Sequence, residues 1–493
     1  MHNLEQSLQE TSAQSPDRLA VEFRNQRFTY GTLAKALQAM DQKMFCVAGM
    51  RVVLLLPDGI PAYLSHLFFF LRGAVVVPMT IQTTTSKLKT LCDRVHPHFV
   101  VTNHPLRSRH AAALESLPTL LVKSGDADVA GGFDFEIQES NKLADNARSA
   151  RGDDGLRLIV FTSGSTGEPK GVCLGASTIL AAAGMNVSFL GLDPSRKSLA
   201  TVPLYDYYGF IQIYSHILAR TGYVFGESAA FPDSIFEKIL AGGVTDLVLV
   251  PHTLRKLLKA ATGERREAMR KLQYMTSSSD LLTPELLKDA FETNSRLKIF
   301  NIYGLTEAGR ACYRVIEASS PPSNSIGRAA PGVEITIEGS NGEPGEIIIR
   351  GPNVMMGYFQ GIQDDLVTLK TCTEMRTGDL GYYNERDEIE LLGRRDHMFN
   401  IKGEKIHPAE IERIAVQAPG VADAQARTSA DTNGDIFVLL DVVPGNGAFD
   451  IGQVNTYVRK HLSPAFFPRE IRVVPDLRRT ELGSKIIRRQ AST

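Results

Sequence analysis

The sequence predicts an α/β protein with a large N-terminal domain, built from two parallel-rich sheets with helices plus a β-barrel-like subdomain, and a small α+β C-terminal domain. Three observations predict this fold. Short continuous apolar runs alternate with amphipathic segments as far as about Arg328, short strands with glycine turns follow, and a mixed pattern begins after Gly393. Continuous apolar strands between helices are typical of parallel sheets covered on both faces.

The elements of the first part follow in regular order. The run RVVLLL stops at Pro57-Asp58-Gly59 and predicts a buried strand, and Pro61 then fits the first turn of a helix. A Gly-, Asp- and Ala-rich stretch at 124–154 predicts a surface connection. The predicted strands are 51–56, 75–77, 98–102, 156–162, 245–251 and 297–301, and the predicted helices are 61–71 and 86–95.

The pattern of the second part predicts a β-rich region and then the small domain. Strands are expected at 333–339, 345–351 and 388–393, each next to a glycine. The last hundred residues predict a helix at 408–417, a strand at 436–443, a helix at 453–462 and a strand at 470–474. We therefore expect a large domain over residues 1–395 and a small mobile domain over 396–493.

Composition excludes several classes of protein. The chain has 493 residues, a formal net charge of −1, 43% hydrophobic and 22% charged residues, which excludes a mostly disordered chain. A near-neutral charge gives no reason to expect nucleic acid as a partner. Five scattered cysteines and a polar N-terminus favour a cytoplasmic location. The most apolar stretch, 63–78, is interrupted by Arg72 and Gly73, so no membrane span is expected.

One glycine- and hydroxyl-rich loop indicates anion binding. The strand 156–162 runs directly into the segment TSGSTGEPKG at 162–171. Small residues let backbone N–H groups approach an anion, hydroxyls donate to it, and Lys170 adds positive charge. The loop lacks the G-x-x-x-x-G-K-[ST] spacing, so it is not the common nucleotide P-loop.

This loop resembles the signature loop of the acyl-adenylate-forming superfamily, which includes acyl- and aryl-CoA ligases, adenylation domains of nonribosomal peptide synthetases and firefly-type luciferases. Further motifs stand in the order of that superfamily and cover essentially the whole chain. They are Y-G-L-T-E at 303–307, R-T-G-D at 376–379, G-R-R-D at 393–396 with P-A-E-I-E at 408–412, and Lys485 near the C-terminus.

The resemblance implies attack of a carboxylate on the α-phosphate of ATP, with release of pyrophosphate. It implies that Thr306 and Glu307 support the α-phosphate and a Mg²⁺ ion, a hard cation that prefers oxygen ligands. Tyr303 would lie against adenine, Asp379 would accept from the ribose hydroxyls, and Arg394 would contact ribose or phosphate. The residues to which it assigns ATP or AMP binding are Thr162, Ser163, Gly164, Ser165, Thr166, Gly167, Lys170, Ser277, Ser278, Tyr303, Gly304, Asp379 and Arg394.

The resemblance also assigns roles to the C-terminal domain. Lys485 would bridge the substrate carboxylate and the α-phosphate, and Asp396 would be the hinge about which the domain rotates before a thiol enters. Gly403 would leave room for a pantetheine arm and Lys405 would face the phosphates of coenzyme A. A plain solvated surface is the alternative for Lys405.

The resemblance places the acyl pocket along the segment VPLYDYYGF at 202–210. Tyr205, Tyr207 and Tyr208 give the pocket an aromatic wall, while Phe210 is interpreted as core. A carboxylate in an apolar pocket is costly, so Asp206 requires a cationic partner. That partner is either a substrate amine or Arg310, and the sequence leaves both open.

Three hypotheses follow for function. The first is an acid–CoA ligase that uses ATP, Mg²⁺ and coenzyme A, because 351–358 and 403–408 resemble that branch most. The second is a free-standing adenylation enzyme that loads an amino acid or another small carboxylic acid onto the phosphopantetheine of a carrier protein, which Asp206 favours. The third is a degenerate relative that binds a nucleotide or acyl ligand without turnover.

Overall fold

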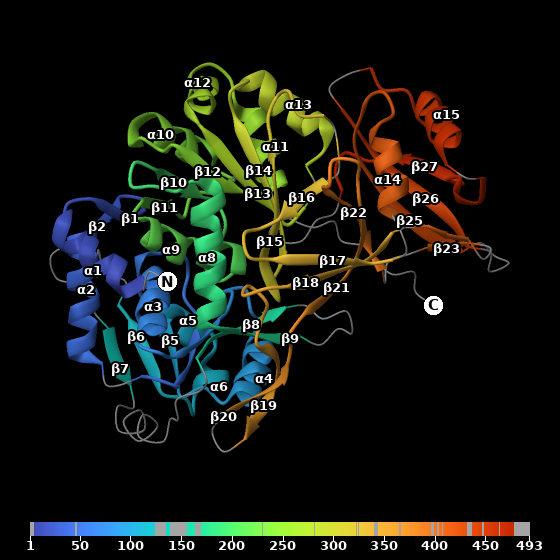
Figure 1. The fold of residues 1–493 in the computed structure, drawn as a ribbon. Coiled ribbons are helices and arrows are strands. Elements are labelled where there is room, and N and C mark those ends of the chain that lie inside the picture. The colour runs from blue at the N-terminus through green and yellow to red at the C-terminus, as the bar shows by residue number, and fades with distance from the viewer. Residues whose placement is uncertain are drawn as a thin grey trace.

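The computed structural model describes residues 4–477, except 45–46, 124–134, 139–154, 163–168, 229, 281, 322, 324, 340–343, 364–365, 396–398, 402–403, 407, 431–435, 446–447 and 463. These residues form two large sheets with helices, a short hairpin and a smaller mixed sheet at the C-terminal end (Figure 1). The predicted α/β body with a small α+β part is confirmed.

The first large sheet is parallel in its centre and antiparallel at its edges. The parallel strands are the apolar runs of the N-terminal part, as predicted. In order, its strands are β20 (Leu366–Thr371), β19 (Gly357–Gln363), β9 (Lys170–Gly175), β8 (Leu156–Thr162), β4 (Val75–Pro78), β3 (Arg51–Leu54), β5 (Phe99–Asn103), β6 (Thr119–Val122) and β7 (Phe135–Gln138).

Side chains alternate between the two faces of this sheet, so both faces need a cover. Val52 belongs to the core between the two large sheets, and its neighbour Val53 belongs to a second core on the opposite face. The outer core is closed by α4 (Thr85–Val95), α5 (His104–Arg109) and α6 (Ala111–Leu114). Continuous apolar strands are the consequence of burial on both faces.

The second large sheet is parallel from β1 to β14 and antiparallel at both ends, where β2 pairs with β1 and β15 pairs with β14. Its strands from β1 to β14 pair in parallel, and β15 and the strands beyond it pair antiparallel, so the predicted β-rich region extends this sheet. In order, the strands are β17 (Glu334–Glu338), β18 (Gly345–Arg350), β21 (Met375–Tyr383), β22 (Ile389–Arg394), β16 (Ser325–Ala329), β15 (Ala308–Ile316), β14 (Lys298–Leu305), β13 (Tyr274–Ser278), β12 (Asp246–Leu249), β10 (Lys197–Ala200), β11 (Gly222–Phe225), β1 (Leu19–Phe23) and β2 (Gln26–Thr29).

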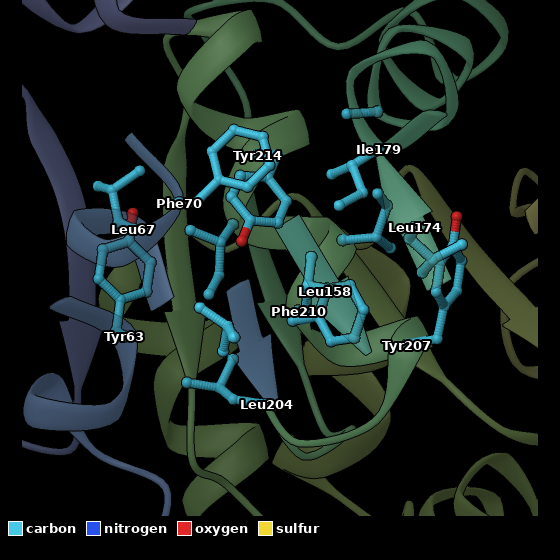
Figure 2. Packing of buried hydrophobic residues seen from close by; sticks show 14 of the residues in the cluster. Tyr63, Leu67, Phe70, Leu158, Leu174, Ile179, Leu204, Tyr207, Phe210 and Tyr214 are labelled. Atoms are coloured by element: carbon cyan, nitrogen blue, oxygen red, sulfur yellow. The ribbon is translucent and has the colours of Figure 1, made fainter. Parts of the chain in front are cut away.

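Helices fill the space between the large sheets and cover the outer face of the second. Figure 2 shows Phe70 against Tyr214 inside the shared core, with ring centres 4.5 Å apart. The inner helices are α3 (Ile60–Leu71), α8 (Ala176–Leu190) and α9 (Tyr207–Ala219), α1 (Leu4–Gln14) and α2 (Tyr30–Lys43) border them, and the outer helices are α10 (Pro232–Gly242), α11 (Pro251–Ala260), α12 (Glu264–Lys271) and α13 (Pro284–Thr293).

Helix α3 explains the most apolar stretch of the sequence. Pro61 lies in its first turn, as predicted, and nearly every residue after it is buried. A helix that is apolar on all sides is stable only inside a core. It ends where Arg72 reaches Asp41 and Glu5 and where Gly73 adopts a φ of +79°. No helix in the described ranges is long and apolar enough to cross a membrane.

The C-terminal part has its own core, built between helices α14 and α15 and a mixed sheet. It lies beside α13 in Figure 1, and Arg255 of α11 comes within 3.6 Å of Asp423. The elements predicted here are found within two residues of their expected ends. The predicted elements are α14 (Pro408–Val416), β26 (Ile436–Pro444), α15 (Ile451–His461) and β27 (Glu470–Val473). The sequence did not predict β23 (Phe399–Ile401), β24 (Glu404–Ile406), β25 (Val421–Ala430) or the 3₁₀ turn Pro464–Phe466.

A buried carboxylate ties the edge of the second sheet to its covering helix. Glu22 of β1 is 5% exposed and accepts hydrogen bonds from Lys197 of β10 at 3.1 Å and from Lys238 of α10 at 2.6 Å. Burial raises the pKa of Glu22, but the hydrogen bonds from Lys238 and Lys197 outweigh it, so the pKa lies below its usual value. The folded state therefore favours the ionised carboxylate.

We expect Glu22→Gln to lower the free energy of unfolding by about 3 kcal/mol, because the buried carboxylate that two half-buried ammonium groups share is lost. A depressed pKa contributes stability that is present above the unfolded pKa and is lost as the pH falls through the folded pKa. The difference between wild type and variant, measured by urea unfolding, should therefore be full at pH 7 and shrink as the solution is acidified below the usual Glu pKa.

Asp93→Asn is the matched control. Asp93 accepts from Lys89 at 3.1 Å on the exposed side of α4, and exposed pairs contribute less than about 1 kcal/mol. A Glu22→Gln effect no larger than that of this control would show that the buried cluster does not hold the sheet edge.

Candidate functional site

The ends of the predicted anion-binding loop are held together by the first sheet. Thr162 at the end of β8 pairs with Lys170 at the start of β9 in antiparallel register. Arg94 of α4 donates to the carbonyl of Pro169 at 3.0 Å and lies over the ring of Phe161. The strands and Arg94 therefore fix where the loop begins and ends. Of the predicted loop residues, Ser163, Gly164, Ser165, Thr166 and Gly167 lie outside the described residues.

The Y-G-L-T-E segment forms the hairpin between β14 and β15. Leu305 pairs with Ala308, so Thr306 and Glu307 make the tight turn. Gly304 is required there, because a Cβ at this position would come within 2.7 Å of the backbone nitrogen of Arg310. The sequence predicted a strand over 297–301, and the strand continues to the turn itself.

The hairpin turn meets the loop exit through a tyrosine. Tyr358 of β19 donates its hydroxyl to the Glu307 carboxylate at 3.1 Å, and Lys170 Nζ lies 5.7 Å from the centre of the same ring. Burial, followed by the Glu307 carboxylate, raises the pKa of Tyr358, so it remains a neutral donor. Two predicted site residues, Lys170 and Glu307, are thus brought together.

Three further predicted residues form a second cluster. The Tyr303 hydroxyl donates to Asp379 at 2.6 Å, and Arg394, paired with Asp379 across β21 and β22, lies 3.5 Å from its other oxygen. Arg394 also donates to the Thr377 carbonyl at 2.6 Å. Burial, then the Asp379 carboxylate, raises the pKa of Tyr303, so this phenol also stays protonated. The cluster presents a fixed carboxylate beside a cation.

The serines at the end of β13 are buried. Ser278 donates its hydroxyl to the Ile302 carbonyl at 2.8 Å and thereby braces β13 against β14. The Ser277 hydroxyl is fully buried and has no hydrogen-bond partner within the described ranges. Their assignment to the adenine side stays a prediction.

The proposed acyl wall begins at the N-terminus of α9. Asp206 caps this helix by accepting from the Tyr208 backbone N–H at 2.9 Å. Tyr207 packs against Gly309, where a Cβ would meet the phenol oxygen at 2.1 Å, and the Tyr208 hydroxyl lies 2.8 Å from that of Thr276. Phe210 lies deep in the core, as interpreted from the sequence (Figure 2), and Tyr205 is half-buried.

Arg310 of β15 is buried beside this wall. Its Nε donates to Asn186 of α8 at 2.8 Å, and its guanidinium lies 4.8 Å from the centre of the Tyr208 ring. Burial lowers the pKa of Arg310, and Tyr208, Tyr207 and Asp206 act in the opposite direction. Of the two partners considered for Asp206, Arg310 therefore interacts with it electrostatically, while the substrate amine stays a prediction.

Several contacts of the site were not found from the sequence. Glu346 of β18 accepts from the Gly378 backbone N–H at 2.9 Å and from Arg395 at 2.8 Å, which ties the R-T-G-D segment to the strand end before the predicted hinge. Tyr358, Asn186 and Arg94 were also missed. The hinge residue Asp396, Gly403 and Lys485 lie outside the described residues, and Lys405 is described only as a member of β24.

Comparison with known proteins gives consistent relatives. Residues 8–359 match the model of the family described as AMP-binding enzyme. The chain is 26% identical over 480 residues to an indoleacetate–CoA ligase of Aromatoleum aromaticum, covering 95% of this chain and 93% of that protein. It is 25% identical over 455 residues to CymA of Salinispora arenicola, a probable non-canonical nonribosomal peptide synthetase, covering 88% of this chain and 6% of that much longer protein.

Solved structures share the fold. ATP-bound MatB from Rhodopseudomonas palustris superposes with a TM-score of 0.76 at 23% identity, covering 97% of this chain and 96% of that one. The predicted fold and the predicted enzyme class, an AMP-forming acid–thiol ligase, are confirmed by these relatives taken together with the matched family. The clusters around Glu307 and Asp379 lie on the motifs that suggested the resemblance. The chain belongs to the AMP-binding enzyme family.

Proposed function

We propose that this chain activates a small carboxylic acid with ATP and passes the acyl group to the thiol of coenzyme A. The observation that carries the proposal is the convergence of Lys170 with Glu307 and of Tyr303 with Asp379 and Arg394. Fixed cations and carboxylates are what a phosphoryl-transfer site needs, because its catalysis is mostly positioning and charge stabilisation.

In the first step the substrate carboxylate attacks the α-phosphorus of ATP. A bond forms between the carboxylate oxygen and phosphorus, and the bond to the β-phosphate oxygen breaks, so pyrophosphate leaves. Lys170 and the donors of the loop would bind the phosphates that depart. Asp379, held by Tyr303, would accept from the ribose hydroxyls, and Arg394 would neutralise nearby phosphate charge.

The residues around Glu307 fit a magnesium ion. Glu307 is a half-buried carboxylate oriented by the Tyr358 hydroxyl, and Thr306 precedes it in the same turn. No cluster of three metal-ligating acidic, His or Cys side chains occurs among the residues that the structure describes. One carboxylate that acts with substrate phosphates is the usual arrangement for Mg²⁺. When bound, the ion would neutralise charge on the phosphate oxygens.

In the second step, transfer to the thiol, the small domain would turn a different face toward the active site. We propose a division into residues 1–395 and 396–493, with Asp396 as the hinge and Lys485 serving only the first step. Gly403 and Lys405 would then border the thiol path. The tie between Glu346 and Arg395 supports this boundary, because it anchors the last described residue before the hinge to β18. Rotation about a few backbone dihedrals at such a point is an economical switch.

The acceptor distinguishes two versions of the proposal. Coenzyme A is favoured by the match to a CoA ligase along nearly the full length of both chains. The alternative is the phosphopantetheine of a carrier protein, which the match to a peptide synthetase and the position of Asp206 favour. Relatives are named for chemically different acids, so the acid must be inferred from the pocket of this chain.

We expect Glu307→Gln to reduce kcat/KM for acid-dependent ATP–pyrophosphate exchange by about 100-fold, because an ionic ligand at the developing phosphoryl charge is lost. Glu317→Gln is the control, since Glu317 pairs with Lys298 on the exposed far end of the same hairpin. Exchange at the wild-type rate in Glu307→Gln would contradict the role assigned to Glu307. Absence of exchange by wild type with every acid of a broad panel would favour the degenerate, non-catalytic hypothesis.

We expect thioester formation with free coenzyme A, measured by mass spectrometry. Lys485→Ala should abolish most adenylation while sparing thioester formation from a supplied acyl-adenylate, because its charge is needed only when two anions meet. Label that reaches only a phosphopantetheinylated carrier would reject coenzyme A as acceptor. Equal loss of both half-reactions in Lys485→Ala would contradict its assignment to the first step alone.

A further inference from the structure

Arg310 is held in an unusual conformation. It is 3% exposed and has a φ of +61°, a left-handed value that is strained for a bulky residue inside a strand. Such strain persists only where the surroundings impose it and is concentrated at functional sites. The adjoining backbone is packed closely, since Gly309 lies against the Tyr207 ring.

Buried polar groups aim the guanidinium. Arg310 Nε donates to Asn186, whose side-chain amide donates to Ser215 at 3.0 Å, and the Ser215 hydroxyl donates to the Ile211 carbonyl at 2.9 Å. Asn186 and Ser215 are fully buried on α8 and α9. This chain of hydrogen bonds fixes the orientation of the guanidinium before any ligand binds.

One nitrogen of this guanidinium has no acceptor among the residues that the structure describes. Within the described ranges Arg310 Nη2 is buried and has no hydrogen-bond partner. Arg314, four residues along the same strand and 5% exposed, donates to the carbonyls of Ser323 and Pro321, both at 3.0 Å, and lies 3.6 Å from Glu388. A buried charged donor without an acceptor is costly. Arg314 shows that a buried arginine of β15 can have acceptors for its donors, which Arg310 Nη2 lacks in the described part of the chain.

Two tyrosines of the predicted acyl wall lie close to Arg310. The Tyr208 ring lies against the guanidinium, and the buried Tyr207 hydroxyl has no partner among the described residues. Figure 2 shows Tyr207 at the edge of the core cluster beyond Phe210, and its hydroxyl lies beside Gly309, next to Arg310 in the chain. Asp206 offsets part of the positive charge, but it acts at a distance on the guanidinium and serves the helix as a cap. A phenol and a planar cation suit a carboxylate or sulfonate.

We propose that the acid activated by this chain carries a second anionic group, a carboxylate or a sulfonate, which Arg310 binds with Nη2 and which the Tyr207 hydroxyl approaches. The inference rests on the proposed function, because it assigns the substrate class of the same site. Arg310 follows Glu307 by three residues, which span at most about 10 Å, and the turn and the left-handed Arg310 shorten that span. The two anionic ends would therefore be separated by a short chain or one ring.

The test compares each diacid with its mono-methyl ester and with the ω-sulfonate of equal length, in ATP–pyrophosphate exchange with wild type, Arg310→Met and Arg314→Met. Wild type should prefer the diacid or the sulfonate over the ester by about 10- to 100-fold in kcat/KM, the effect of one charged hydrogen bond. Arg310→Met should abolish that preference. Arg314→Met should retain it even if its melting temperature falls.

The comparison of diacid with ester in wild type needs no variant. The test is therefore decisive even if Arg310→Met does not fold. Equal use of ester and diacid by wild type would overturn the second anionic site while the exchange itself upheld the proposed function. Preference for an α-amino acid without a second anion, lost in Asp206→Asn, would also overturn it. If no acid supports exchange, the proposed function fails, and a thermal-shift assay then tests the second anionic site by itself. Diacids that raise the melting temperature of wild type but not of Arg310→Met support the site. Absence of any shift rejects it.

Discussion

The hairpin at Thr306 and Glu307 is the constraint on which the site depends. At this hairpin the parallel part of the second sheet meets its larger antiparallel part. The parallel strands all end at the same edge of the sheet. A hairpin at that edge places the next strand antiparallel and beside the one before it. Tyr303 before the turn and Arg310 after it are therefore held on adjacent strands, and the antiparallel strands that follow carry Asp379 and Arg394 back to the same place.

Buried charges organise the parts that the sheets bring together. Glu307 meets the Tyr358 hydroxyl, Asp379 meets that of Tyr303, and Glu346 collects a backbone N–H and Arg395. Each carboxylate is oriented by neutral or cationic donors, so little reorganisation is needed when a charged substrate arrives. A chain with almost no net charge can bind several phosphates in this way, because local placement supplies what the total charge does not.

Local patterns predicted the fold well and the tertiary contacts poorly. The strand at 156–162 was predicted with its observed ends because a buried apolar run stops at a glycine-rich loop. Asp206 followed by a helix is a capping signature that the sequence already contained, yet it was interpreted only as a pocket residue. Asn186 and Tyr358 act through partners more than fifty residues away, and one sequence carries no information on such pairings. The polar Asn186 within the apolar helix α8 was the one available signal.

In the proposed site, recognition of the acid and its activation share one rigid element. Glu307 and Arg310 are joined by β15, and Gly304, packed against the Arg310 backbone, joins them to Tyr303 across the turn. A displacement of this hairpin would shift the carboxylate of the phosphate side and the cation of the acyl side together. The distance between the reacting carboxylate and a second anionic group of the acid is therefore determined mainly by the backbone and only slightly by flexible side chains. An acid that fits both ends aligns its carboxylate with the α-phosphate as a consequence of binding, which is how positioning lowers a barrier.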